Sequence, residues 1–275
     1  MKSAPFDYVR PSSVDEALAE LANGDAKVLA GGQSLVPVLA MRLARPTTLV
    51  DINGIHGLGE LRCTGNELVV GAAVRQRRLE RDQSVPLIAL ALPWVGHREL
   101  RSRGTVCGSL AHADPAAELP AVACCLDAVI EVAGPNGRRT ERARDFFTGP
   151  MSTTVGPTEL VVSARFPVAR PGEGFGFAEI ARRHGDFALA GVAVRVMVAD
   201  GVVHAAVLTA FGVSDRPRTR DVTNLVGEPL ADLAEELVDT EGDTHGSQAY
   251  RRRLLTVLAE RELTRAVAAA GTEST

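Results

Sequence analysis

The alternation of apolar and polar positions predicts that the chain begins with a short α/β unit. Ser13 and Glu16 have the spacing of a capping box, and the residues after them repeat apolar positions at the interval of an α-helix. A buried strand is expected over 26–30, a helix-like apolar run over 35–41, and a second buried strand over 48–52. Strands and helices therefore alternate from the start.

The next part of the chain predicts hairpins and helices. Apolar runs flank the turn residues 64–66 and again 135–137, and each arrangement predicts a β-hairpin. The segment 74–81 is compatible with a helix, and 85–94 is so apolar that we expect it to be buried. A further strand is expected over 159–166.

A change in composition marks the expected domain boundary. Glycine and proline residues cluster at 167–174, so we place one domain over 1–170 and a second over 174–275. The apolar runs after the boundary predict three antiparallel strands, over 175–181, 188–199 and 202–211.

Helices follow these strands. The last one, at about 248–269, carries a row of leucines on one side and the three arginines 251–253 near its start. We interpret these arginines as a solvated face or a subunit contact, because no aromatic residues are interleaved with them.

Length and charge narrow the functional classes. A chain of 275 residues can bury two modest cores, and its net charge of −4 gives no general attraction for nucleic acid or anionic membranes. No run approaches the ~18 uninterrupted apolar residues that a membrane span needs, and the first residues form no apolar signal region. We expect a cytoplasmic protein that binds no nucleic acid and has no membrane span.

The cysteines and histidines do not have the spacing of a metal site. No C-x-x-C pair occurs, and we interpret all four cysteines (63, 107, 124 and 125) as buried free thiols. An iron–sulfur cluster needs about four thiolates at compatible spacings, and the six histidines are scattered. We therefore expect neither an iron–sulfur cluster nor another metal site on this chain.

The stretch 103–120, RGTVCGSLAHADPAAELP, has the composition of a phosphate-binding loop. Its small residues leave backbone N–H groups uncovered, and such groups bind anions. We expect Asp114 to cap a helix that opens at Pro115 and carries Glu118 in its first turn. A loop that only turns a corner is the alternative, but the loop after the strand 26–30 is equally rich in small residues, which favours one shared anion site.

Other chemistries fit the motifs less well. Ser109, His112 and Asp114 invite comparison with a hydrolase triad, but a nucleophile elbow needs Gly-x-Ser-x-Gly, which is absent around Ser109. No G-x-G-x-x-G follows a strand, and no G-x-x-x-x-G-K-[ST] occurs. Rossmann and P-loop folds are not expected.

The motifs AGGQSL at 30–35 and RGTVCGSLAHADPAAELP at 103–120 together resemble the FAD-binding medium subunit of the molybdenum hydroxylases, the carbon monoxide dehydrogenase and xanthine dehydrogenase family. The stretch GFAEIARRHGDFAL at 176–189 resembles the start of that family's C-terminal domain. One departure is that Cys107 precedes Gly108, where the family often has a glycine pair. We expect the Cys107 side chain to point away from the diphosphate and to pack.

The resemblance implies an α+β fold. A p-cresol methylhydroxylase-type FAD-binding domain of two α/β subdomains would be followed by a C-terminal domain with a three-stranded antiparallel sheet and helices. The cofactor would be FAD, held noncovalently.

The resemblance also implies a set of cofactor-binding residues and no catalytic or metal-binding ones. The first diphosphate loop would comprise Ala30, Gly31, Gly32, Gln33 and Ser34, with Leu29 and Leu35 adjacent. The rest of the site would comprise Thr105, Gly108, Ser109, His112, Asp114, Glu118 and Phe187.

Three of these positions have an alternative interpretation. Glu118 would hydrogen-bond the sugar-like chain of the flavin, or it is a helix first-turn carboxylate. Phe187 would pack on the flavin ring, or it is a core aromatic. His112 is a flavin neighbour or a plain loop residue.

The implied function is an electron relay. A small [2Fe–2S] subunit and a large molybdopterin subunit would be partners, assembled as a dimer of heterotrimers, and FAD would pass electrons from the clusters to an external acceptor. Two alternatives stay open: a self-contained FAD-dependent oxidase or reductase of the same fold, and a binding or assembly module without flavin.

Overall fold

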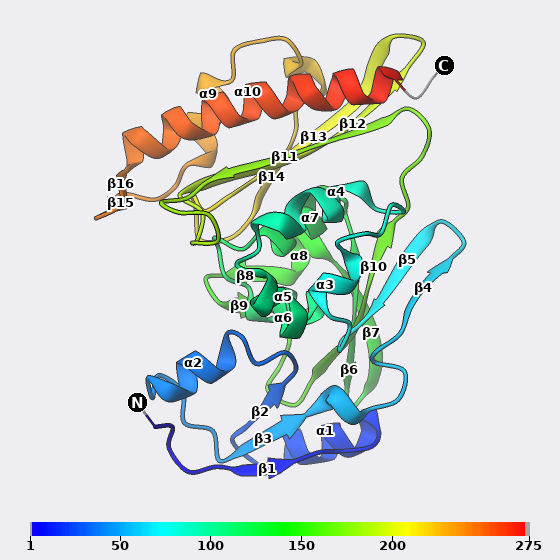
Figure 1. Ribbon diagram of the computed structural model, residues 1–275, viewed down its shortest axis with the longest axis vertical. Coiled ribbons are helices and arrows are strands. Elements are labelled where there is room, and N and C mark those ends of the chain that lie inside the picture. The colour runs from blue at the N-terminus through cyan, green and yellow to red at the C-terminus, as the bar shows by residue number, and fades with distance from the viewer. Residues whose placement is uncertain (1, 273–275) are drawn as a thin grey trace.

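The computed structural model describes residues 2–272, which form three parts stacked along the longest axis of the molecule (Figure 1). The N-terminal subdomain lies at one end, drawn in blue, and a second subdomain of mixed helices and strands lies in the middle. The C-terminal domain, with its long helix, lies at the other end. This is the α+β architecture expected from the sequence.

The N-terminal subdomain is a small parallel sheet with helices. Strand β3 lies between β1 and β2, parallel to both, and 3-10 helix η1 follows β3. Because β2 and β3 are parallel, their carboxyl ends meet at one edge of the sheet. The elements are β1 (Asp7–Val9), α1 (Val14–Ala22), β2 (Ala26–Leu29), α2 (Leu35–Ala40), β3 (Thr48–Asp51) and η1 (Ile52–Gly54).

The cap of α1 forms as the sequence predicts at one of its two positions. The Ser13 hydroxyl accepts from the N–H of Glu16 at 3.1 Å. The Glu16 carboxylate accepts from the N–H of Ser12 at 2.7 Å, and a weaker backbone hydrogen bond from Ser13 also lowers its pKa. The principal partner of Glu16 is therefore Ser12, one residue before the expected one.

The second subdomain is an antiparallel five-stranded sheet in the order β4-β5-β10-β6-β7, and both predicted hairpins are part of it. The strands are β4 (Leu61–Thr64), β5 (Glu67–Gly71), β6 (Val129–Gly134), β7 (Gly137–Arg142) and β10 (Leu160–Pro167), with a separate hairpin of β8 (Phe147–Gly149) and β9 (Ser152–Thr153). The helices are α3 (Gln76–Leu79), α4 (Pro86–Ala91), η2 (Leu92–Trp94), α5 (Arg98–Arg103), α6 (Val106–His112), α7 (Glu118–Cys125) and α8 (Ala143–Phe146).

The C-terminal domain is a four-stranded antiparallel sheet with helices, and its fourth strand was not predicted. That strand, β14, has the sequence RTRD and pairs with β13 at the edge of the sheet. An edge strand without apolar alternation gives no signal in the sequence pattern. The elements are β11 (Glu173–Ile180), β12 (Ala190–Ala199), β13 (Val202–Phe211), β14 (Arg218–Asp221), η3 (Thr223–Leu225), α9 (Ala231–Leu237), β15 (Gly242–Asp243), β16 (Gly246–Ser247) and α10 (Gln248–Thr272).

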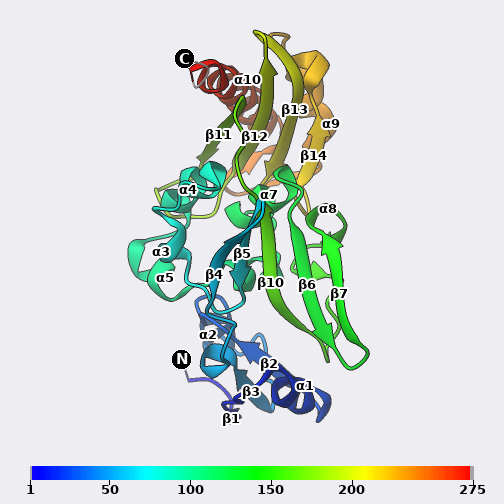
Figure 2. The ribbon, with the colours of Figure 1, turned by 90° about the vertical axis from the view of Figure 1, so that its right-hand side faces the viewer.

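Helices cover both faces of this C-terminal sheet (Figures 1 and 2). Helix α10 packs on one face, where a methyl group on Gly174 would lie 1.9 Å from the carbonyl oxygen of Ala266. Helices α4 and α7 of the middle subdomain pack on the other face, and Phe177 and Phe211 join the core of that subdomain. The expected boundary at 167–174 falls on the connection from β10 to β11. One face of the C-terminal sheet joins the core of the middle subdomain, and the other face forms a separate core with α9 and α10.

The four cysteines are free thiols, as expected, but one of them is exposed. Cys107, Cys124 and Cys125 are buried, whereas Cys63 lies on the solvent side of edge strand β4. The expectation of burial is therefore wrong for Cys63. None of the helices within residues 2–272 has the length and hydropathy that a membrane-crossing helix needs. The cytoplasmic location stays a prediction.

Arg251 corrects the interpretation of the arginines 251–253. Its side chain is buried and its guanidinium donates to the carbonyl oxygens of Leu189 and Gly212, the latter at 2.7 Å. It also pairs with Asp243 at 2.8 Å. Arg251 therefore anchors the start of α10 to the C-terminal sheet, while Arg253, two residues later, is exposed.

We predict that Arg251→Met lowers the free energy of unfolding by about 2–4 kcal/mol, because buried carbonyl oxygens lose their donor. Arg253→Met is the matched control and should change it by less than about 0.5 kcal/mol. Chemical denaturation of both variants measures the difference. Equal stability of the two variants would contradict the anchoring role.

Candidate cofactor site

The two small-residue loops lie in direct contact. A methyl group on Gly31 would lie 2.4 Å from the carbonyl oxygen of Arg103 and 2.7 Å from the Cα of Gly104. Only glycine allows these two backbones to come so close. The structure thus brings 30–34, which follows β2, against the connection between α5 and α6.

The first loop presents a row of free backbone donors. Gly32 has a φ of +73°, a conformation that favours glycine, and Gln33 folds back to donate from Nε2 to the Gly31 carbonyl at 3.2 Å. Within residues 2–272, the N–H groups of Gly31, Gly32, Gln33 and Ser34 make no hydrogen bond. Such a row of N–H groups can bind an oxyanion.

The second stretch is a helix where a loop was expected. Thr105 is buried and caps α6, and its hydroxyl accepts from the N–H of Gly108 at 3.0 Å. Val106, Cys107 and Leu110 face the core, because their spacing forms an apolar stripe on a helix. Gly108 and its neighbour Ser109 lie on the half-exposed side. A methyl group on Gly108 would lie 3.8 Å from the Cβ of Ala30.

The predicted helix start at Pro115 is also wrong. Helix α6 ends at His112, and Ala113 adopts the left-handed conformation. The Asp114 carboxylate accepts from the N–H of Ala116 at 2.9 Å, which forms a turn and not a helix cap. Helix α7 begins only at Glu118. Asp114 and His112 therefore frame a short turn between the two helices.

A polar network beneath the loops was missed by sequence reasoning. The side-chain amide of Asn53 donates to the Ala30 carbonyl at 2.8 Å, and Arg75 donates to the Asn53 side-chain oxygen at 2.7 Å. The same guanidinium donates to the Arg103 carbonyl. One arginine and one asparagine thus connect both loops.

Asp51 holds Asn53 in place. Its carboxylate accepts from the Asn53 N–H at 2.9 Å and from the Tyr8 hydroxyl. Burial opposes ionisation of Asp51, but the hydrogen bonds from Tyr8 and Asn53 outweigh it and lower the pKa of the carboxyl. The sequence held one positional signal: Asp51 ends β3 and Asn53 follows it, at the edge of the sheet where Gly31 follows β2.

Glu118 and Cys107 differ in their surroundings. Glu118 is partly buried, and burial raises its pKa to about 7, with the charge of Asp114 adding to the shift and Arg101 opposing it. Cys107 is fully inside the core, where its thiol donates to the Val70 carbonyl at 3.5 Å and burial raises its pKa to about 12. The packing role expected for Cys107 is confirmed.

Phe187 lies on the loop between β11 and β12 and is 71% exposed, so its interpretation as a core aromatic is wrong. This loop rests on the turn before α5. A methyl group on Gly185 would lie 3.1 Å from the His97 ring, and His184 stacks on Trp94 with ring centroids 5.7 Å apart. The structure therefore presents Phe187 to solvent on a loop that is packed at its base.

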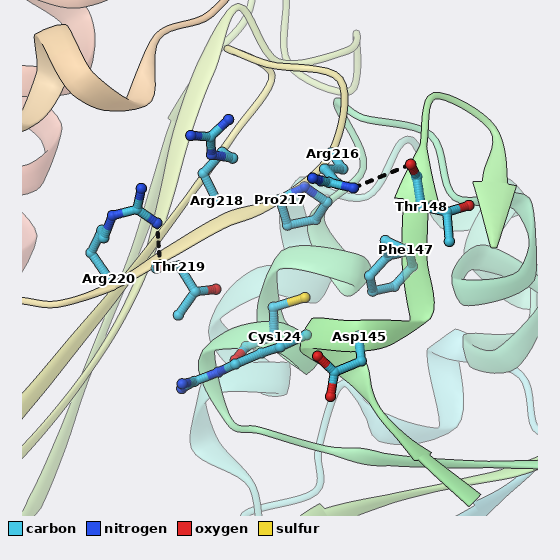
Figure 3. Close-up of a pocket in the computed structure, with 10 residues that line it drawn as sticks. Cys124, Asp145, Phe147, Thr148, Arg216, Pro217, Arg218, Thr219 and Arg220 are labelled. Atoms are coloured by element: carbon cyan, nitrogen blue, oxygen red, sulfur yellow. Dashed lines mark hydrogen bonds between the residues drawn. The ribbon is translucent and has the colours of Figure 1, made fainter. Parts of the chain in front are cut away.

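A second polar feature lies between α8 and β14 (Figure 3). Four arginines, Arg144, Arg216, Arg218 and Arg220, line a cavity of about 450 Å³, and Arg216 donates to the Thr148 carbonyl at 3.2 Å. This basic cavity is built from other elements than the two loops. In the part of the chain that the structure describes, no cluster of His, Cys, Asp and Glu could hold a metal ion.

Two family models match the chain. The model described as the FAD binding domain in molybdopterin dehydrogenase matches residues 4–169. The model described as the CO dehydrogenase flavoprotein C-terminal domain matches residues 175–266. The chain is 37% identical to the 6-hydroxypseudooxynicotine dehydrogenase complex subunit alpha of Paenarthrobacter nicotinovorans, over 97% of this chain and 96% of the relative.

Further relatives and solved structures match this chain over nearly its whole length. The carbon monoxide dehydrogenase medium chain of Afipia carboxidovorans is 34% identical, over 96% of this chain and 98% of the relative. A structure of carbon monoxide dehydrogenase from Hydrogenophaga pseudoflava superposes with a TM-score of 0.92 at 32% identity, over 98% of this chain and 99% of that one. The structure of quinoline 2-oxidoreductase from Pseudomonas putida 86 superposes with a TM-score of 0.91 at 34% identity, over 98% of this chain and 99% of that one.

We predict that Gly31→Ala weakens FAD binding by at least about tenfold, because the added methyl group pushes the two loops apart. Gly59→Ala is the control, since a methyl group on Gly59 meets no atom within 4 Å. Fluorescence titration of the FAD-free chain measures both dissociation constants. An unchanged dissociation constant for a folded Gly31→Ala chain would show that the contact is dispensable.

We also predict that Cys107→Ala keeps the full FAD content of the wild type. The sulfur lies in the core, so its loss should cost only about 1 kcal/mol of stability. The ratio of flavin to protein after purification, read beside the thermal midpoint, checks both parts. A stable Cys107→Ala chain without flavin is the contrary result.

Proposed function

The chain belongs to the family of FAD-binding medium subunits of the molybdenum hydroxylases, and from that premise we propose that it is the electron relay of a three-subunit enzyme. It is an oxidoreductase subunit and its cofactor is FAD. In the proposed complex, a small subunit holds the [2Fe–2S] clusters and a large molybdopterin subunit carries out the substrate chemistry. Two such heterotrimers form a dimer, and the electrons leave through FAD to an external acceptor.

One observation supports this proposal most strongly: the contact between the two loops at Gly31. It exposes free N–H groups of 31–34 beside the glycine-bearing side of α6, where a side chain at Gly31 would not fit. The residues present therefore fit a dinucleotide, which needs close approach of its diphosphate to the backbone. When bound, FAD takes up electrons singly and releases them in pairs.

The proposed roles of the individual residues follow from their positions. Gly31, Gly32, Gln33 and Ser34 bind the diphosphate through their N–H groups, and Leu29 and Leu35 flank them. Thr105 fixes the start of α6, where Gly108 lies beside Ala30 of the first loop and Ser109 is the next residue of the helix. The Asn53–Arg75 pair keeps the loops in register.

Three further residues complete the proposed site. Glu118 hydrogen-bonds the sugar-like chain of the cofactor. His112 and Asp114 shape the turn that leads to Glu118. Phe187, exposed on its loop, covers the flavin ring, a role that a solvent-facing aromatic with a packed loop base can take.

The source of the electrons is proposed to be another subunit, because the thiols of this chain are unsuited to a cluster. Cys124 and Cys125 donate to the carbonyl oxygens of Ala143 and Ala193, each at 3.4 Å. Burial raises the pKa of both thiols, so the thiolates that iron needs are disfavoured. Cys63 and Cys107 lie apart from this pair, on β4 and α6.

Electron transfer from a reduced small subunit tests the proposal without knowledge of the substrate. The [2Fe–2S] subunit is reduced with dithionite, freed of excess reductant and mixed with the FAD-loaded chain. We expect bleaching of the flavin absorbance with this donor and none with a cluster-free small subunit. Dithionite added directly serves as the control that the flavin can be reduced.

The second part of the experiment uses the chain together with the small and large subunits. A hydroxylase substrate should reduce the flavin only when the small and large subunits are both present. Rapid substrate-driven reduction by the lone chain would overturn the relay and favour a self-contained FAD-dependent oxidase or reductase. A folded chain that takes up no FAD would favour the flavin-free assembly module.

A further inference from the structure

Strand β11 carries two buried glutamates with opposite surroundings. Glu173 and Glu179 are 6% and 2% exposed and lie on the same face of the strand, six residues apart. Glu173 accepts from the Arg195 guanidinium at 3.0 Å and from the Arg170 N–H at 2.9 Å. Neither carboxyl oxygen of Glu179 has a hydrogen-bond partner among residues 2–272.

This difference sets their protonation. Burial opposes ionisation of Glu173, but its hydrogen bonds and the charge of Arg195 outweigh burial and lower the pKa. Burial raises the pKa of Glu179 to about 9, and the negative charge of Glu118 adds to the shift. At neutral pH Glu179 is therefore an uncharged carboxyl group with one hydrogen to donate.

The backbone places Glu179 toward the FAD-binding domain. Alternate residues of β11 face opposite sides, and a methyl group on Gly174 or Gly176 would meet α10. Phe175 and Phe177 face the other way and pack against the core of the middle subdomain. Glu179 shares their side and lies close enough to Glu118, at the start of α7, for their charges to interact.

Few other charged side chains lie near Glu179. Helix α4, which packs on β11, has the sequence PLIALA and carries none. Glu262 of α10 lies on the opposite face of the strand, against Gly176. Arg182 pairs with Asp186 at 3.8 Å on the exposed loop. Asp114 and Arg101 lie near Glu118, where their charges act on its carboxyl group and shift its pKa in opposite directions.

We propose that Glu179 is a further cofactor-binding residue, whose protonated carboxyl group donates a hydrogen bond to an acceptor oxygen of the flavin half of FAD. A buried carboxyl group without a partner is costly, and buried polar groups are as a rule paired. The diphosphate belongs to the loops, whereas the ring carbonyl and sugar-chain oxygens are acceptors for a group next to Glu118. This inference rests on the proposed cofactor site.

A pH dependence of binding follows. Below about pH 9 Glu179 largely keeps its hydrogen, and at higher pH the ionised carboxylate cannot donate and repels a nearby acceptor oxygen. The dissociation constant for FAD should therefore rise by up to about tenfold per pH unit above that point. Protonation of Glu179 also affects the free energy of unfolding. Because the unfolded carboxyl ionises near its ordinary pKa, the FAD-free chain should lose stability as the pH rises from about 4.5 toward 9.

Three variants of the full-length chain test the proposal by calorimetric titration with FAD between pH 7 and pH 10. Glu179→Gln keeps a donor without a charge, so it should bind like the wild type at pH 7 and lack the rise of the dissociation constant above about pH 9. Glu179→Leu removes the donor and should raise the dissociation constant at least about tenfold. Glu173→Gln is the matched control from the same strand and should lower the thermal midpoint while the FAD affinity stays unchanged.

Further readouts separate a binding role from a structural one. Glu118→Gln removes the neighbouring negative charge, so the inflection in the pH profile should move to lower pH. Thermal midpoints of the FAD-free Glu179→Gln chain should fall less between about pH 7 and about pH 9 than those of the wild type, because Glu118 titrates near the lower end of this range. Equal FAD affinity of the wild type and Glu179→Leu, or the same pH profile for the wild type and Glu179→Gln, would overturn this inference alone. A wild-type chain that takes up no FAD would overturn the proposed site with it.

Discussion

The close approach of two backbones at Gly31 is the constraint on which the site depends. Any side chain there would collide with the carbonyl oxygen of Arg103, so the N-terminal subdomain can dock on α5 and α6 only through a glycine. The Asn53–Arg75 pair then fixes the register of the contact from below. The N–H groups of 31–34 are left without a hydrogen-bond partner within residues 2–272.

A second organising feature is the position of the C-terminal sheet between two sets of helices. Glycines on one side of β11 let α10 approach its backbone, and phenylalanines on the other side extend the core of the middle subdomain. One face of the C-terminal sheet therefore extends the core of its neighbour, while the other face forms a separate core with α9 and α10. A polar residue on the shared side, such as Glu179, is enclosed by both domains.

Local patterns in the sequence predicted most of the elements. The strands 26–29 and 48–51, both hairpins and the long strands after Glu173 follow from apolar runs and turn residues, which act over short distances. Helix α6 was missed because its glycine and small residues are typical of loops, and β14 because it is polar. Arg251 is buried through partners far away in sequence, and Glu179 is enclosed by a domain other than its own, and no local pattern contains either relation. The cofactor and its residues came from the family resemblance.

The proposed site is divided between two subdomains, and this division has a consequence for how firmly they are held together. One wall follows β2 of the N-terminal subdomain, and the other is α6 of the middle one. A ligand that touches both walls binds only when the subdomains are docked, so its binding free energy is added to that of docking. The flavin would thus hold the two subdomains together. Without it, the chain would first separate at the contact between β2 and α6, before either subdomain unfolds.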